Sequence, residues 1–292
     1  MIAKLRLLTV ICVLWIPILA HAQGLITATI DQALGRSGQK TGDIYRVSFP
    51  RTDLHVSVHG VAIKPGLALG SWAAFSGSDE KAMVMGDLVL LEDELNPVLD
   101  KLHSAGFEIS AVHNHLTDET PRVLYLHYMG HGPAGQLASS LKTALAVSKT
   151  PLEKPAAAAE EPTPPAWVKS VEDSVGRKGT FKGGVLAYAV PRGEEITMDG
   201  MAIAPAAGVA ESINFQDAGS GKIATTGDFV LIASEVNPVI SELRTNGILV
   251  TALHSHMLTE QPRLFFMHFW AVGTPESVGA GIKAALNRVS IK

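Results

Sequence analysis

The sequence predicts an α+β protein made of two tandem homologous repeats, each a mostly antiparallel sheet covered by helices. The chain of 292 residues matches itself at an offset of 141, as from Asn96-Pro97 to Asn237-Pro238, with a one-residue gap around residues 52–59. Both copies contain short stretches that alternate polar and apolar residues, a periodicity typical of half-exposed strands. Both also contain helix start and stop residues, and this mixture favours helices that cover one face of a sheet.

The elements are expected in the same order in both repeats. Asparagine caps a helix, proline suits its first position, and glycine supplies the left-handed conformation that ends it. In the first repeat we expect a half-exposed strand at 53–59, a helix from Asn96-Pro97 to Gly106, a strand pair at 107–112 and 123–126, and a last helix at 134–145. The half-exposed strand of the second repeat is expected at 195–199.

The duplication also sets the domain boundaries. A first repeat at 23–148 and a second at 171–292 flank a linker at 149–170 that is rich in proline and alanine. Such a composition is typical of an exposed, semi-extended segment. Because the copies are homologous, we expect them to pack against each other as an intrachain pseudo-dimer.

Residues 1–22 have the pattern of a secretory signal peptide. Lys4 and Arg6 precede an apolar run too short to span a bilayer, which ends in Ala20-His21-Ala22. We predict cleavage after Ala22, a periplasmic or secreted protein, and no integral membrane span after cleavage. Cys12 lies inside the removed segment, so the mature chain has neither disulfides nor thiolate metal sites.

Composition excludes several other classes of protein. With 47% hydrophobic residues the chain is globular, and a formal net charge of −4 gives no electrostatic footprint for a nucleic acid. A nucleic acid is therefore not expected as a partner.

Three histidines and a glutamate recur at matched positions around the predicted strand pair. Two histidines at i and i+2 on a strand point to one face, and a third from the neighbouring strand completes a set of nitrogen ligands. The glutamate could be a fourth ligand or a general base. Such ligands suit divalent zinc, manganese, iron or copper. The predicted metal ligands are His113, His115, Glu119 and His127 in the first repeat and His254, His256, Glu260 and His268 in the second.

The strand register decides whether each set can converge. If His113 lies opposite His127, then both share one face with His115 and Tyr125. A slip of one residue would move His127 to the other face. The sequence leaves both registers open.

Matched acids and arginines provide further candidates. Asp87 and Asp228 each follow a glycine, where an acidic residue has ordinary capping reasons to occur. We predict Arg122 and Arg263 as ligand-binding residues, because each opens the strand that carries the third histidine. The remaining matched arginines could clamp an anion but more often pair with local carboxylates; they are Arg36 with Arg177 and Arg51 with Arg192.

Two resemblances add to these observations. The spacing His-x-His-x-x-x-Glu is similar to the first metal motif of the cupins, which implies metal-ligand chemistry; the helix directly before the strand argues against the cupin fold. Three segments resemble the LppY/LpqO family, exported bacterial proteins with a domain of unknown function, and the resemblance covers both repeats. It implies an exported two-repeat protein and names no reaction. The segments are Gly86-Asp87-Leu88-Val89-Leu90, Glu94-Leu95-Asn96-Pro97-Val98, and His113-Asn114-His115 with Pro121-Arg122.

Three functions follow as hypotheses. The first is an exported protein that binds a divalent metal, zinc being one candidate, or a small ligand through one site in each repeat. The second is a metal-dependent hydrolase in which Glu119 or Glu260 activates water. The third is a metal-free structural or interaction module with the histidines as its polar core.

Overall fold

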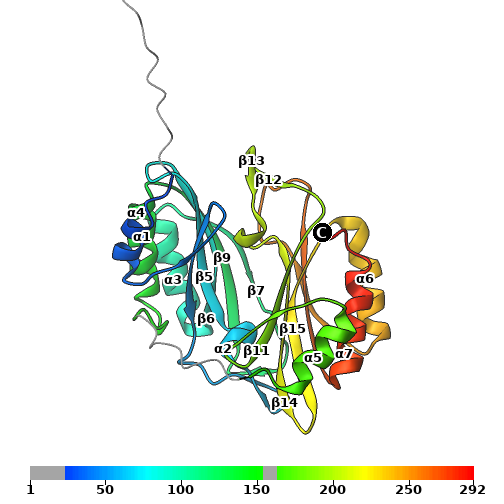
Figure 1. Cartoon of the computed structure of the whole chain (residues 1–292). Helices are drawn as coiled ribbons and strands as arrows, with labels where there is room; N and C mark the ends of the chain where they lie inside the picture. Colours follow the sequence, from blue (N-terminus) through cyan, green and yellow to red (C-terminus); the bar gives the residue numbers. More distant parts are fainter. Residues whose placement is uncertain (1–23, 154–162) are drawn as a thin grey trace, which may run out of the picture.

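The computed structural model describes residues 24–153 and 163–292, which form two similar halves that face each other. Each half has a six-stranded sheet with helices on its outer face, so the layers run helix, sheet, sheet, helix (Figure 1). This confirms the predicted α+β fold with two tandem repeats. The predicted signal peptide lies outside the described residues. Within the described ranges, no helix has the length and hydropathy needed to cross a bilayer.

The two sheets have the same strand order, and every pair of neighbouring strands is antiparallel. In the first repeat the order is β1 (Gln39–Thr41), β2 (Ile44–Pro50), β5 (Gly70–Gly77), β6 (Ala82–Leu91), β9 (Val123–Gly132) and β7 (Glu108–His113). In the second it is β10 (Thr180–Lys182), β11 (Val185–Pro191), β14 (Ala210–Gly219), β15 (Lys222–Leu231), β17 (Phe265–Gly273) and β16 (Leu249–His254). The predicted strand pair is therefore β7 with β9, at one edge of the sheet.

Three longer helices cover the outer face of each sheet (Figure 1). They are α1 (Thr27–Leu34), α3 (Glu92–Ser104) and α4 (Ala134–Leu145) in the first repeat, and α5 (Ala166–Val175), α6 (Ala233–Thr245) and α7 (Pro275–Leu286) in the second. The last helix of the first repeat has the predicted bounds. Helix α5 begins inside the predicted linker, because its apolar residues Val168, Val171 and Val175 pack into the second core.

The expected helix start at Asn96-Pro97 is wrong, and the reason is a capping carboxylate. Helix α3 begins earlier, where the Glu94 carboxylate accepts a hydrogen bond of 2.9 Å from the Leu91 N–H. Acidic side chains in this first turn also suit the positive end of the helix dipole. Pro97 consequently lies inside the helix, where it gives up one backbone hydrogen bond. Gly106, with φ of 83°, follows the end of the helix as predicted.

A small hairpin projects from each repeat toward the other. The first arm comprises β3 (Ser57–Val58), β4 (Val61–Ala62) and α2 (Pro65–Ala68), and the second comprises β12 (Ile196–Met198), β13 (Met201–Ile203) and the 3-10 turn η1 (Pro205–Ala207). The strands expected at 53–59 and 195–199 are thus shorter than predicted. Each hairpin turns through two residues of positive φ, as at His59 and Gly60, a geometry that matches the twist of paired strands.

Apolar side chains fill the space between the sheets as well as the space under the helices. One cluster joins the second arm to Met83, Met85 and Met129 on the inner face of the first sheet. Another joins the first arm to Ala224 and Trp270 of the second sheet. The repeats therefore share a core, and each arm contributes to it.

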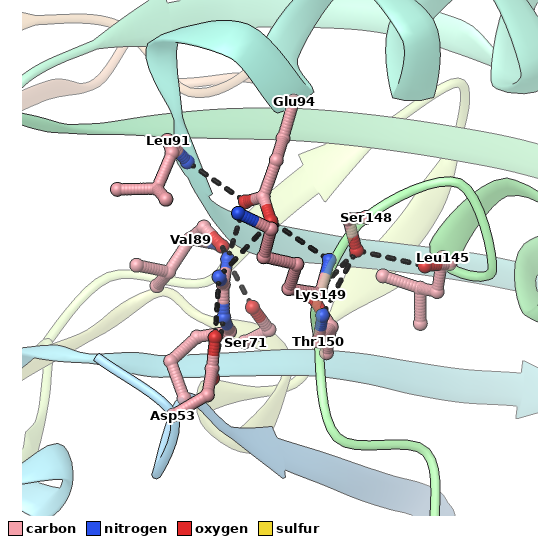
Figure 2. A network of polar contacts seen from close by, with 10 residues as sticks. Asp53, Ser71, Val89, Leu91, Glu94, Leu145, Ser148, Lys149 and Thr150 are labelled. Atoms are coloured by element: carbon pink, nitrogen blue, oxygen red, sulfur yellow. Dashed lines mark hydrogen bonds and ion pairs between the residues drawn. The ribbon is translucent and has the colours of Figure 1, made fainter.

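A buried arginine fastens the first sheet to helix α3 and to the chain beyond α4. The Arg51 side chain is 0% exposed and contacts Glu94 at 2.8 Å, Asp53 at 2.8 Å and the Val89 carbonyl at 2.6 Å. Glu94 in turn accepts a hydrogen bond of 2.7 Å from the Lys149 N–H (Figure 2). Two carboxylates thus balance the positive charge of Arg51, and hydrogen bonds provide partners for its buried N–H groups.

The second repeat has the same buried network of an arginine and carboxylates. Arg192 contacts Glu235 at 2.8 Å and donates a hydrogen bond to the Val230 carbonyl, and Glu235 accepts one of 2.8 Å from the Ser290 N–H. The sequence left open whether the matched arginines clamp an anion or pair with local carboxylates, and Arg51 and Arg192 pair with local carboxylates, which belong to their own repeat.

Candidate functional site

The strand register places two of the predicted histidines of each repeat, His113 with His127 and His254 with His268, on the inner face of the sheet. His113 lies opposite Tyr125, and Ala111 lies opposite His127. This pairing differs from the register with His113 opposite His127 by an even number of residues, so His127 stays on the same face. In the second repeat His254 lies opposite Phe266, and the arrangement is the same.

The six histidines form one cluster between the repeats, not two separate sites. The His113 ring stacks on His254, its own counterpart, with 3.6 Å between ring centroids. His115 stacks on His268 at 3.6 Å, and His127 stacks on His256 at 3.7 Å. Each contact recurs with the roles of the two repeats exchanged, as in a twofold-symmetric dimer. The expected intrachain pseudo-dimer thus places its axis beside His113 and His254.

Two reciprocal hydrogen bonds hold the histidine-bearing edges together. The Ser110 hydroxyl donates to the His256 carbonyl at 2.6 Å, and the matched Thr251 hydroxyl donates to the His115 carbonyl. Each bond crosses from one repeat to the other. The backbone of the second histidine in each motif is therefore positioned by the opposite repeat.

Two aspartates join the cluster. Asp87 on β6 and Asp228 on β15 lie directly opposite His127 and His268, respectively, in neighbouring strands. The Asp87 carboxylate is 3.7 Å from His127 and 3.9 Å from His115, and Asp228 is 3.0 Å from His268. Their expected role as turn caps is wrong, because Gly86 and Gly227 lie within long strands and not in turns.

Two groups of side chains in the described ranges bring potential ligand atoms within 4.8 Å of one another. The first consists of His113, His254, His256 and His268, and the second consists of His115, Asp228 and His268. Both groups draw ligands from both repeats. Neither contains Glu119 or Glu260.

Backbone carbonyls fix the protonation of two rings in the first group. His113 Nδ1 lies 3.1 Å from the Asn114 carbonyl, and His268 Nδ1 lies 2.9 Å from the Gly227 carbonyl. A carbonyl only accepts, so in each ring Nδ1 carries the proton and Nε2 presents a lone pair. Both Nε2 atoms are buried and have no hydrogen-bond partner among the described residues. This is the arrangement of histidine ligands oriented by an outer contact.

Burial keeps the imidazoles neutral. It lowers the pKa of His113 to about 4 and that of His254 to about 3, and it holds the pKa of His115, His127, His256 and His268 well below the usual value. Removal from water disfavours the charged form of a base. The same cause raises the pKa of Asp87 to about 8 and holds the pKa of Asp228 well above its ordinary value.

These shifts predict that the metal-free protein loses stability as the pH falls from about 6.5 toward about 4. In that window the unfolded histidines bind protons that the folded ones do not, and each such proton lowers the free energy of unfolding by about 1.4 kcal/mol per pH unit. Asp87 and Asp228 have raised pKa values and oppose this trend, but the histidines outnumber them.

The measurement is urea unfolding of chelator-treated protein at a series of pH values. A His113→Gln, His254→Gln double variant should show a shallower dependence, whereas His103→Gln, at an exposed helix position, should retain the wild-type slope. Constant stability across this window would contradict the prediction.

The two glutamates that the sequence placed in the site lie in the segments that precede β9 and β17. Glu260 is fully buried and accepts hydrogen bonds from the Leu264 N–H at 2.9 Å and from Arg263 at 3.2 Å. Glu119 forms the short strand β8 (Glu119–Thr120), which pairs with β3 of the first arm. Burial raises the pKa of Glu119.

The predicted ligand-binding arginines also lie in these segments. Arg263 donates to the Met257 and Leu258 carbonyls at 3.1 and 3.2 Å and pairs with Glu260. The Arg122 side chain is 62% exposed and lies 3.7 Å from Glu92. The hydrogen bonds of Arg263 are thus made within its own segment, and Arg122 forms an exposed ion pair with Glu92.

Two adjoining cavities lie beside the histidine cluster. Their volumes are about 330 and 340 Å³, a size at the lower end of small-ligand pockets. Both are lined by Arg46, Trp72, Asp87 and Asp228; the first also reaches His115, and the second reaches His127 and His256. The cluster is therefore accessible to a small molecule from between the sheets.

Sequence reasoning considered Asp87 and Asp228 as acids but favoured a capping role for them, and it missed Arg46 as a site residue. A signal for the aspartates was present, because Gly86-Asp87 and Gly227-Asp228 recur at the same offset as the histidines. Arg46 had no such signal, since its counterpart at that offset is Ala187.

Comparison with known proteins places both repeats in one family. A family model described as "Domain of Unknown Function (DUF1259)" matches residues 28–147 and again residues 169–288. No curated protein matches the chain. Among solved structures, the trimeric bacterial microcompartment shell protein PduB aligns over 87% of this chain and 89% of its own, with 12% identity and a TM-score of 0.22. EtuB from Clostridium kluyveri aligns over 86% and 88%, with 9% identity and a TM-score of 0.20. At such scores these alignments carry no argument about fold or function.

Proposed function

This chain belongs to the family described as Domain of Unknown Function (DUF1259), and for this member we propose that the histidine cluster binds one divalent metal ion between the repeats. One observation carries the proposal. His113, His254, His256 and His268 present ligand nitrogens within 4.8 Å of one another, from both repeats. Imidazole ligands suit zinc, and they also accommodate copper, iron or nickel.

Unpartnered polar atoms support this proposal. The His113 and His268 Nε2 atoms are buried with no hydrogen-bond partner among the described residues, and burying such atoms without a partner is unfavourable. In addition, the Nε2 atoms of His254 and His256 approach each other to 2.8 Å. Two lone pairs at this distance repel, unless one nitrogen carries a proton or both bind a cation. A metal ion would satisfy all four nitrogens together.

The test is a count of tightly bound metal by elemental mass spectrometry, on residues 23–292 purified without a histidine tag. We expect close to one ion per chain, because the ligands from both repeats form a single site. His254→Ala should lose the ion, and His103→Ala, outside the cluster, should keep it. Protein that holds no ion after reconstitution with zinc, manganese, iron or copper would overturn the proposal.

A metal-dependent hydrolase is the second candidate, favoured by the cavity that reaches His115 and Asp228. Glu260 is fully buried and pairs with Arg263, whereas Glu119 is only partly buried, so Glu119 is the better candidate of the two for a general base. Hydrolysis of p-nitrophenyl acetate and bis-p-nitrophenyl phosphate by metal-loaded protein, with Glu119→Gln as the variant, tests this function. If the protein shows neither bound metal nor turnover, the third hypothesis, a metal-free structural or interaction module, is the one that remains.

We also propose that the protein is exported through the signal peptide at residues 1–22, as the LppY/LpqO resemblance implies. The motif similarity to cupins is consistent with metal-ligand chemistry at the same histidines. Detection of a mature chain that begins at Gln23 in the extracytoplasmic fraction would support export. A full-length chain retained in the cytoplasm would contradict it.

A further inference from the structure

The cavity beside the histidine cluster contains a cation, Arg46, that interacts electrostatically with Asp87 but is not in salt-bridge contact with it. Arg46 projects from β2, and its guanidinium carbon lies 3.9 Å from the centre of the Trp72 ring. One nitrogen donates a hydrogen bond of 3.1 Å to the Ala206 carbonyl on the second arm. The guanidinium makes no other hydrogen bond and no salt bridge to residues 24–153 or 163–292. An arginine has five N–H donors, so most of this fork is available to a ligand.

The position of the Arg46 side chain is set from both repeats. Trp72 packs against the second arm so closely that a Cβ on Gly208 would lie 2.9 Å from its ring. The ring holds one face of the guanidinium, and the Ala206 carbonyl holds one edge. A planar cation held in this way offers its remaining edge for a two-point hydrogen bond with a carboxylate. Burial lowers the Arg46 pKa to about 10, so the group stays charged at neutral pH.

The charged and titratable groups around the cavity determine whether a suitable ligand is an anion or a cation. Arg46, Asp87 and Asp228 line both parts of the cavity. The remaining titratable lining groups are His115 and Tyr125 in one part and His127, His256 and Tyr188 in the other. A divalent ion at the histidines would offset the two aspartates and leave the Arg46 charge in excess. The rest of the lining includes Pro50, Pro65 and Leu67, apolar surface suited to an organic body.

We propose that this cavity binds a small organic acid, with its carboxylate on Arg46 and its other end directed toward the histidine cluster. The proposal rests on the proposed metal site for its charge balance, and on Arg46 and Trp72 for its geometry. In this proposal Arg46 takes the ligand-binding role that the sequence assigned to Arg122 and Arg263.

The test is calorimetric titration of the mature chain with succinate and benzoate, with the neutral amides succinamide and benzamide as controls. Each titration is made on metal-loaded and on chelator-treated protein. We expect at least one acid to bind the metal-loaded protein and its amide not to bind. Arg46→Gln should weaken the binding roughly tenfold or more, as expected for loss of a charge-assisted hydrogen bond. Arg288→Gln removes the same charge from an exposed pair with Glu242 and should leave binding unchanged.

Metal counted in the same samples separates the two proposals. Arg46→Gln that keeps its metal but loses the acid supports both proposals. Metal binding without acid binding, or acid binding that survives in Arg46→Gln, overturns the organic-acid site alone. Binding of inorganic phosphate but of neither acid also overturns it. If the protein takes up no metal on reconstitution and still binds the acid through Arg46, the metal centre alone is overturned. Failure of both metal and acid binding overturns both proposals.

Discussion

Replacing Arg51 by alanine is expected to lower the free energy of unfolding by about 3–5 kcal/mol, the usual cost of removing one partner from a buried ion pair. The Arg51 side chain is 0% exposed, and the Glu94 side chain is 4% exposed. Without the guanidinium, the Glu94 carboxylate would remain buried with only backbone N–H groups as partners. The measurement is urea unfolding at neutral pH.

Two further variants give this prediction its controls. Arg51→Met combined with Glu94→Gln removes both charges and keeps an oxygen for the Leu91 and Lys149 N–H groups. It should be less destabilised than Arg51→Ala. Arg122→Ala breaks an exposed pair and should cost less than about 1 kcal/mol. Equal losses for Arg51→Ala and Arg122→Ala would refute the structural role given to Arg51.

Zinc is expected to raise the free energy of unfolding by about 4 kcal/mol when its free concentration is a thousand times the dissociation constant. At the proposed site the ion would bind the folded protein selectively, because its ligands are far apart in the sequence. His254 and His268 lie on β16 and β17, His256 follows β16, and His113 belongs to the other repeat. Unfolding separates them. Thermal and urea unfolding with zinc and with a chelator measure the difference.

The matched variants isolate the site. His256→Ala removes a ligand of the four-histidine group and should abolish the gain, whereas His131→Ala, at an exposed strand position, should preserve it. The comparison is made within each variant, with and without zinc, so any change in intrinsic stability cancels. A gain of equal size in His256→Ala would contradict a site at this cluster.

The sequence predicted the elements of each repeat well where the signal was local. The burial alternation at 53–59, the end of a helix at Gly106 and the last helix at 134–145 depend on neighbouring residues, and the structure has each of them. The start of α3 was misplaced because two local signals competed. The capping carboxylate of Glu94 prevails over Asn96-Pro97, and Pro97 is accommodated within the helix.

The site was less predictable because its assembly is not local. The duplication identified His113 and His254 as equivalent, but equivalence does not say that the two rings stack on each other. That contact depends on how the inner faces meet, which is set by the arms and the shared core. The carboxylate partner was misjudged for a similar reason. Glu119 is near His115 in sequence, whereas Asp87 reaches His127 through strand pairing.

The difference between Arg46 and Ala187 has a consequence that follows from joining two repeats in one chain. A dimer of identical subunits would show every side chain twice around its axis, so an arginine on one side of the histidines would face an identical arginine on the other. Here the cavity has Arg46 and Trp72 on β2 and β5 of the first repeat, and Ala187 and Ser212 on the strands opposite. A molecule bound between the sheets therefore meets a polarised environment, and only one of its two possible orientations places an acid group on the cation.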